Sequence, residues 1–65
     1  MYSLVGVDGN AYALMGYVSG AMKREGFPKT DVDSMIKDAT SGDYMHLVGV
    51  CSSWIDKVNA KVEGN

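Results

Sequence analysis

Apolar residues recur at helical spacing along most of the chain, from residue 11 to residue 62. Three segments carry this pattern, and we predict helices over residues 11–25, 31–41 and 44–62. Because the apolar positions fall three or four residues apart, each helix would present one face to a shared core. These positions are Ala11, Leu14, Met15, Val18 and Met22, then Val32, Met35, Ile36 and Ala39, then Tyr44, Leu47, Val48, Cys51, Ile55, Val58 and Val62.

Residues that favour helix ends stand at the boundaries of these segments. Asn10, Thr30 and Asp43 each precede a predicted helix, and each has a side-chain oxygen that can accept from a backbone N–H of the first turn. Gly26 and Gly42 follow the first two helices, where glycine readily adopts the left-handed conformation that ends a helix. The helices are therefore expected to be joined by tight turns.

Residues 2–7 read Tyr-Ser-Leu-Val-Gly-Val, a density of β-favouring residues that predicts a short strand. A single strand needs partners for its backbone donors and acceptors. The segment therefore either pairs with the same segment of a second chain or lies as an extended arm over the helices. The predicted fold is mostly α, a compact single domain with a short N-terminal strand and three helices.

The small size of the chain favours oligomerisation. Sixty-five residues bury a marginal core, which small domains usually reinforce with a disulfide, a metal or a partner subunit. The one cysteine, Cys51, cannot form an intrachain disulfide, and the one histidine, His46, has no second soft ligand with which to hold zinc. We therefore expect a homo-oligomer, either a dimer or a larger assembly.

Charge and hydropathy narrow the possible partners. The net charge is −2 and no cluster of Lys and Arg is present, which disfavours binding to nucleic acid. The first apolar run, residues 4–7, is too short for a signal peptide or a membrane span. With its lone cysteine, the chain is expected to be cytoplasmic.

Gly16 and Gly20 lie opposite the apolar face of the first predicted helix, where a solvated helix normally carries long polar residues. Each glycine costs roughly 1 kcal/mol of helix stability relative to alanine. We interpret them as a second packed face, most simply packed against the N-terminal strand, and otherwise against a second subunit or a target. The alternative is an exposed glycine edge.

Val50 and Trp54 form a candidate contact patch beside the apolar face of the third helix. Tryptophan is enriched at the energetic centres of protein interfaces, although the rim of a small core also uses large aromatic residues. The candidate partner-binding residues are Val50, Trp54, Gly16, Gly20 and Tyr17. If the chain instead binds a small ligand between subunits, the candidate residues are Asn10, Tyr12 and Tyr17.

The sequence has no pair or group of residues at a spacing that would form a catalytic site. His46 and Cys51 are five residues apart, so on one helix they point about 140° away from each other. Cys51 lies on the apolar face, where a thiol is inert. We expect no catalytic activity, no cofactor and no metal site.

Two segments, residues 4–12 (Leu-Val-Gly-Val-Asp-Gly-Asn-Ala-Tyr) and 39–44 (Ala-Thr-Ser-Gly-Asp-Tyr), together resemble an uncharacterised family of very small bacteriophage and prophage proteins. The resemblance extends to residues 15–17 and 55–59. It implies a phage origin, a compact oligomer and a target in the cytoplasm of a bacterial host.

Three functional hypotheses follow. The first is a non-catalytic inhibitor that binds a host protein, such as a defence protein. The second is an oligomeric sponge for a nucleotide immune signal, which the low count of Lys and Arg disfavours because phosphates bind cations. The third is a small DNA-binding regulator, although the third helix offers few base-reading side chains on its outer face.

Overall fold

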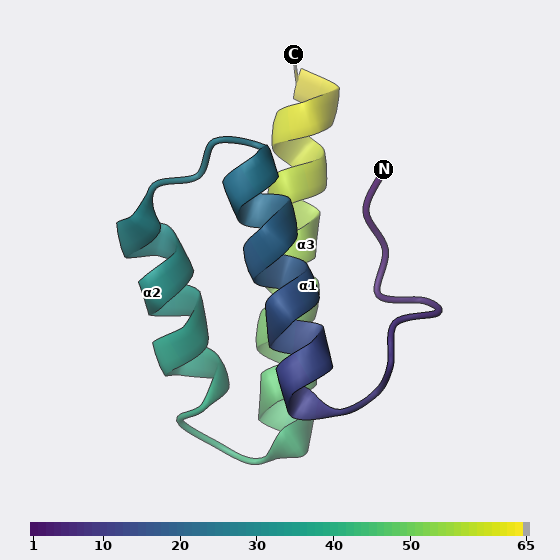
Figure 1. The fold of residues 1–65 in the computed structure, drawn as a ribbon, viewed down its shortest axis with the longest axis vertical. Coiled ribbons are helices and arrows are strands. Elements are labelled where there is room, and N and C mark those ends of the chain that lie inside the picture. Colours follow the sequence, from purple (N-terminus) through teal and green to yellow (C-terminus); the bar gives the residue numbers. More distant parts are fainter. Residues whose placement is uncertain (65) are drawn as a thin grey trace.

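The computed structural model describes residues 1–64, which form three helices preceded by an extended arm. The helices are α1 (Ala11–Arg24), α2 (Lys29–Ala39) and α3 (Tyr44–Gly64). Figure 1 shows α1 and α3 running in the same direction, with α2 running in the opposite direction beside them. The molecule measures 34 × 26 × 15 Å, and α3 follows its long axis. The prediction of a mostly helical chain with three helices is confirmed.

Helix α1 begins and ends at local signals that are visible in the sequence. The Asn10 side chain accepts a hydrogen bond from the backbone N–H of Ala13 at 2.8 Å. At the other end, Gly26 has a φ of 81°, and the N–H of Phe27 donates to the carbonyl of Met22 at 2.9 Å. This is a Schellman ending, which turns the residue after the glycine back onto the helix. Phe27 therefore packs against the core.

Helix α2 begins two residues before the predicted start, and Thr30 does not cap it. Pro28 takes the cap position with a φ of −66°, and no side chain donates or accepts a capping hydrogen bond there. The carbonyl of Pro28 accepts from the N–H of Asp31 at 3.0 Å. Proline suits a helix start because its φ is already helical and it has no N–H to leave unsatisfied.

Helix α2 also ends early, at Ala39, because two hydroxyl groups satisfy its last carbonyls. The Thr40 hydroxyl donates to the carbonyl of Ile36 at 2.8 Å, and the Ser41 hydroxyl donates to the carbonyl of Asp38 at 2.6 Å. Side-chain hydroxyls at this position compete with the helical hydrogen-bond pattern and favour a turn. The helix therefore stops before the glycine that was expected to end it.

Gly42 has a different role, at the start of α3. A Cβ atom on Gly42 would lie 2.9 Å from Cγ of His46, so the close approach of this imidazole requires a glycine. Asp43 caps α3 as predicted, and its carboxylate accepts from the N–H of His46 at 2.9 Å. The helix continues to Gly64, two residues beyond the predicted end.

Residues 2–7 do not form the predicted strand. The N–H of Val7 donates to the carbonyl of Leu4 at 3.1 Å, and Gly6 has a φ of 86°. A four-residue turn with positive φ at its third position is a type II β-turn, for which glycine is favoured. Val5 lies at the tip of this turn and is 91% exposed.

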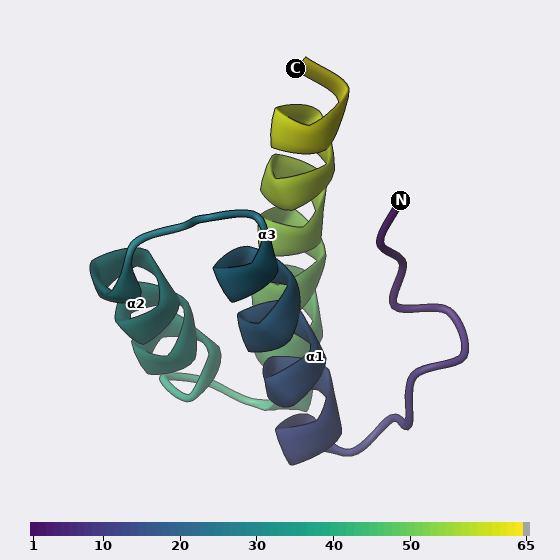
Figure 2. The same ribbon diagram turned by 45° about the horizontal axis from the view of Figure 1, so that its top comes forward.

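The segment instead lies as an arm along the helices. Figures 1 and 2 show the arm on one side of the α1–α3 pair and α2 on the other side. The side chains of Tyr2, Leu4 and Val7 are half-buried against the core. Of the two alternatives for this segment, the structure has the extended arm.

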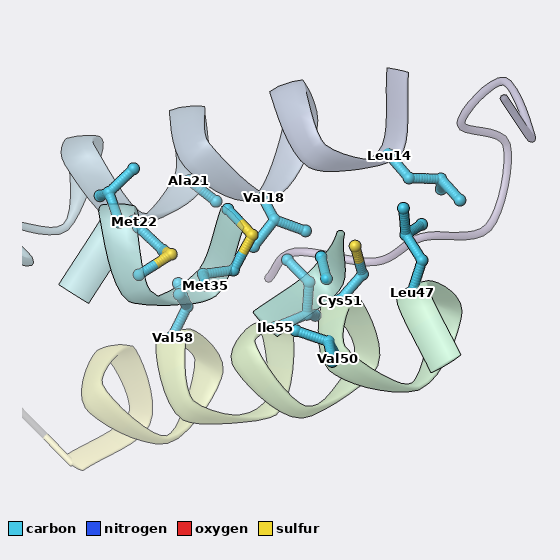
Figure 3. Close-up of a cluster of buried hydrophobic side chains, with 12 residues drawn as sticks. Leu14, Val18, Ala21, Met22, Met35, Leu47, Val50, Cys51, Ile55 and Val58 are labelled. Atoms are coloured by element: carbon cyan, nitrogen blue, oxygen red, sulfur yellow. The ribbon is translucent and has the colours of Figure 1, made fainter. Parts of the chain in front are cut away.

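The core lies between the three helices, and Figure 3 shows Met35 of α2 between side chains of α1 and α3. Three predicted core residues are exposed by more than a third: Ile36, Tyr44 and Val62. Ala21 and Val50 are buried instead. The buried residues are Leu14, Val18, Ala21, Met22, Val32, Met35, Ala39, Leu47, Val50, Cys51, Ile55 and Val58.

Candidate functional site

An open recess of about 470 Å³ lies along α3 beside the end of α2, and we call it the α2–α3 groove. Most of its lining residues come from one face of α3, at spacings of three or four residues. This spacing places them on adjacent turns, so they form one continuous wall. The lining residues are Asp38, His46, Gly49, Val50, Ser53, Trp54 and Lys57.

Trp54 is the largest side chain of the α2–α3 groove, and its ring contacts two other side chains. The rings of Phe27 and Trp54 pack edge to face, with centroids 6.3 Å apart and planes at 76°. The ammonium group of Lys57 lies 4.1 Å from the centroid of the indole ring, a favourable cation–π geometry. The half-buried ring is therefore preorganised, which lowers the entropic cost of using it to bind a partner.

Val50 does not lie on the exposed surface that the sequence suggested. Its side chain is 8% exposed and belongs to the core, because α3 is covered on two sides by α1 and α2. It still reaches the α2–α3 groove, where it lies near Trp54 as an apolar floor. The proposed pair therefore meets in one recess, with Trp54 as the accessible member.

The other lining residues were not selected from the sequence. His46, Gly49, Ser53 and Lys57 share one face of α3 with Trp54, and that common spacing is the signal that could have identified them. Asp38 comes from α2, and only the packing of the two helices brings it to the groove.

The imidazole of His46 is fixed by α2. Its Nε2 atom lies 3.0 Å from a carboxylate oxygen of Asp38, 2.9 Å from the Asp38 carbonyl and 3.3 Å from the hydroxyl of Ser41. In a serine–histidine–aspartate relay, the aspartate and the serine contact opposite nitrogens of the ring. Here both contact the same nitrogen, so this arrangement positions the ring and does not relay a proton between them.

Cys51 is fully buried between the helices, as its position on the apolar face predicts. Burial raises the pKa of its thiol, because removal from water disfavours the thiolate. The nucleophilic form is therefore scarce, and the side chain acts as a small apolar core residue.

The raised pKa of Cys51 predicts a loss of stability at alkaline pH. Above the ordinary thiol pKa of 9.0, the unfolded chain loses its proton while the folded chain keeps it. The free energy of unfolding should then fall as pH rises through this value and on toward the raised pKa. Urea titrations between pH 8 and about 10.5 should show a steeper fall in the natural chain than in Cys51→Val, where no thiol titrates. Equal slopes would contradict the assignment.

Within the described residues, nothing packs against Gly16 and Gly20 of α1. A Cβ atom built on Gly16 or Gly20 would meet no atom within 4 Å, so neither glycine contacts the arm. The interpretation that they pack against the N-terminal segment is therefore wrong. The arm contacts another part of α1, where the Tyr17 hydroxyl accepts from the N–H of Ser3 at 3.1 Å.

The three candidate ligand residues have separate positions and roles. Asn10 caps α1, Tyr12 is 85% exposed, and Tyr17 packs against the ring of Tyr2 with centroids 6.3 Å apart. None of them lines the α2–α3 groove or the smaller recess beneath the arm. These three residues therefore do not come together in either of the two recesses of the described chain.

Comparisons of the chain with protein-family models, curated proteins and solved structures give no match. Within residues 1–64, no helix is long and apolar enough to cross a membrane. The same part of the chain has no cluster of three or more His, Cys, Asp or Glu side chains that could hold a metal ion.

Proposed function

We propose that this chain is a non-catalytic binding protein that docks on another protein through the α2–α3 groove. The observation that carries the proposal is the position of Trp54, a half-buried ring at an open recess of about 470 Å³. Binding energy at protein interfaces concentrates in such partly buried aromatic anchors. The resemblance of residues 4–12 and 39–44 to small phage proteins favours a protein of a bacterial host as the target, and inhibition as the result.

The charges of the groove favour a protein partner over a nucleotide. Lys57 is the one Lys or Arg among the residues that line it, and Asp38 adds a carboxylate. A phosphate-bearing ligand is normally held by several cationic or N–H donors, and a nearby carboxylate repels it. A mixed polar and apolar wall around an aromatic anchor is typical of a protein interface.

Replacing Trp54 with alanine should weaken binding to the partner by about 2 kcal/mol or more, close to 30-fold in affinity. The partner would first be trapped in bacterial cells by a photo-crosslinking residue placed at Ser53, which is exposed in the groove. The same crosslinker at Lys23, on the exposed face of α1, serves as the control. The affinity of the purified partner would then be measured by calorimetry.

A second variant separates binding from folding, since Trp54 also contacts the core. Ser53→Arg fills the groove from an exposed position and should abolish binding while the helical circular dichroism is retained. Ala60→Arg makes the same change at an exposed position of α3 that lines neither recess, and it should bind normally. Normal binding by folded Ser53→Arg would refute the proposed site.

A further inference from the structure

The backbone of the arm is recognised by a side chain of α3. The N–H of Tyr2 donates to Oδ1 of Asn59 at 2.9 Å, and Nδ2 of Asn59 donates back to the carbonyl of Tyr2 at 2.8 Å. The amide thus offers one donor and one acceptor to a single residue, as a neighbouring strand would in a sheet. This two-point contact binds an extended backbone regardless of how that backbone is connected to the helices.

The side chain of Tyr2 is held just as specifically by α1 and by Glu25, the residue that follows it. Its hydroxyl donates to the carboxylate of Glu25 at 2.7 Å and accepts from the guanidinium of Arg24 at 3.4 Å. Its ring packs edge-on against Tyr17. Together with Asn59, these residues form what we call the Tyr2 receptor, a site on α1 and α3 built for a tyrosine at the second position of an extended segment.

The segment that joins the arm to α1 contacts α3 at one point, where the Tyr44 hydroxyl donates to the carbonyl of Gly9, and it makes none of the contacts of Tyr2. Asp8, Gly9 and Asn10 join the arm to α1, and all three are exposed. The contacts of the arm are made by discrete side chains and are not continued from a helix. An identical arm from another chain would therefore find the same donors, acceptors and apolar contacts.

We infer that the Tyr2 receptor also accepts the N-terminal arm of a second copy of this chain, so that two copies associate by exchanging arms. The occupant is a second copy because the receptor matches this sequence at its backbone, its hydroxyl and its ring. When two chains exchange arms, each contact within a chain is replaced by the same contact between chains. The dimer therefore forms with little change in interaction free energy. The inference does not depend on the α2–α3 groove, which lies on another face of α3.

The protein concentration determines whether the closed monomer or the arm-exchanged dimer is the more populated form. A short flexible tether holds the arm at an effective concentration in the millimolar range. The closed monomer should therefore dominate in dilute solution, and exchange should become visible as the protein approaches about 1 mM. If a substitution weakens the binding of a chain's own arm to its Tyr2 receptor, that receptor should accept the arm of another chain at a lower protein concentration.

Two complementary full-length variants test the inference. Tyr2→Ala leaves the receptor intact but weakens the chain's own arm, which keeps only its backbone contacts with Asn59. Asn59→Ala leaves the arm intact and removes the two hydrogen bonds between Asn59 and the backbone of Tyr2. Unlabelled Asn59→Ala chain is added to ¹⁵N-labelled Tyr2→Ala chain, up to about 1 mM, and the side-chain amide signals of Asn59 are followed by NMR. We expect these signals to move toward their positions in the natural chain, with saturation.

The matched control is an unlabelled chain that carries both substitutions, so that it offers neither an intact arm nor an intact receptor. It should leave the Asn59 signals unchanged. If Asn59→Ala does not fold by circular dichroism, Asn59→Asp takes its place, because it removes the donor to the Tyr2 carbonyl at nearly constant size. Asn59 signals that stay fixed up to about 1 mM, with both chains folded, would overturn the inference.

Discussion

Replacing Met35 with alanine should lower the free energy of unfolding by about 2–5 kcal/mol, the usual cost of a large-to-small change in a core. Met35 is fully buried, and its side chain reaches from α2 to both other helices (Figure 3). A domain of this length has a total stability of roughly 3–10 kcal/mol, so this single change removes much of it. Urea denaturation followed by circular dichroism measures the difference.

The neighbouring residue provides the control. Ile36 has a side chain of similar size on the same helix, but it is 39% exposed. Ile36→Ala should therefore cost markedly less than Met35→Ala, because its atoms already contact water and little cavity is left behind. Equal losses for the two variants would show that α2 is rotated relative to the arrangement described above.

The double variant Gly16→Ala/Gly20→Ala should raise the free energy of unfolding by about 2 kcal/mol. Each change removes the roughly 1 kcal/mol penalty of a glycine inside a helix. Among residues 1–64, no atom outside the neighbouring residues and the nearby helix backbone lies within 4 Å of either Cβ position, so nothing there opposes the added methyl groups. The melting temperature should rise by about 8–16 °C for a domain of this size.

Gly26→Ala is the matched control, and its effect should have the opposite sign. Gly26 has a φ of 81°, which costs a residue with a Cβ about 1–2 kcal/mol. If the double variant at Gly16 and Gly20 instead loses stability relative to the natural chain, and this loss grows with protein concentration, these glycines pack against a second copy. That result would restore the original interpretation of a packed glycine face, now between chains.

Short-range signals made the helices predictable from the sequence. The cap at Asn10 and the left-handed Gly26 act within a few residues of the helix ends, so one local segment contains the whole cause. The start of α2 was misplaced because two local signals compete there, and the fixed φ of Pro28 prevails over the capping side chain of Thr30.

The arm shows how a local pattern can mislead. Leu4, Val5 and Val7 have the composition of a strand, and composition alone does not reveal where the chain turns. Gly6 was the informative residue, because its positive φ closes a type II turn. Because of this turn, Leu4 and Val7 are half-buried against the helices, while Val5 between them is exposed.

The candidate site depends on packing between helices, which a periodic pattern does not specify. The α3 pattern located Trp54 at the edge of the apolar face, but Val50 becomes buried only because two helices cover α3. Asp38 and His46 are eight residues apart on different helices, and their contact at 3.0 Å forms where α2 and α3 pack together. The groove is thus a property of the assembled bundle.

The pair of hydrogen bonds between Tyr2 and Asn59 also has a consequence for the order of folding. These residues are 57 positions apart, so the contact closes almost the entire chain into a loop. Contacts between distant residues carry the largest entropic cost before they form, while the helices and their short turns need only local contacts. The bundle should therefore assemble first and the arm should dock last. In the folded protein, the arm should accordingly be the first part to open, and its amide hydrogens should exchange with solvent while those of the core remain protected.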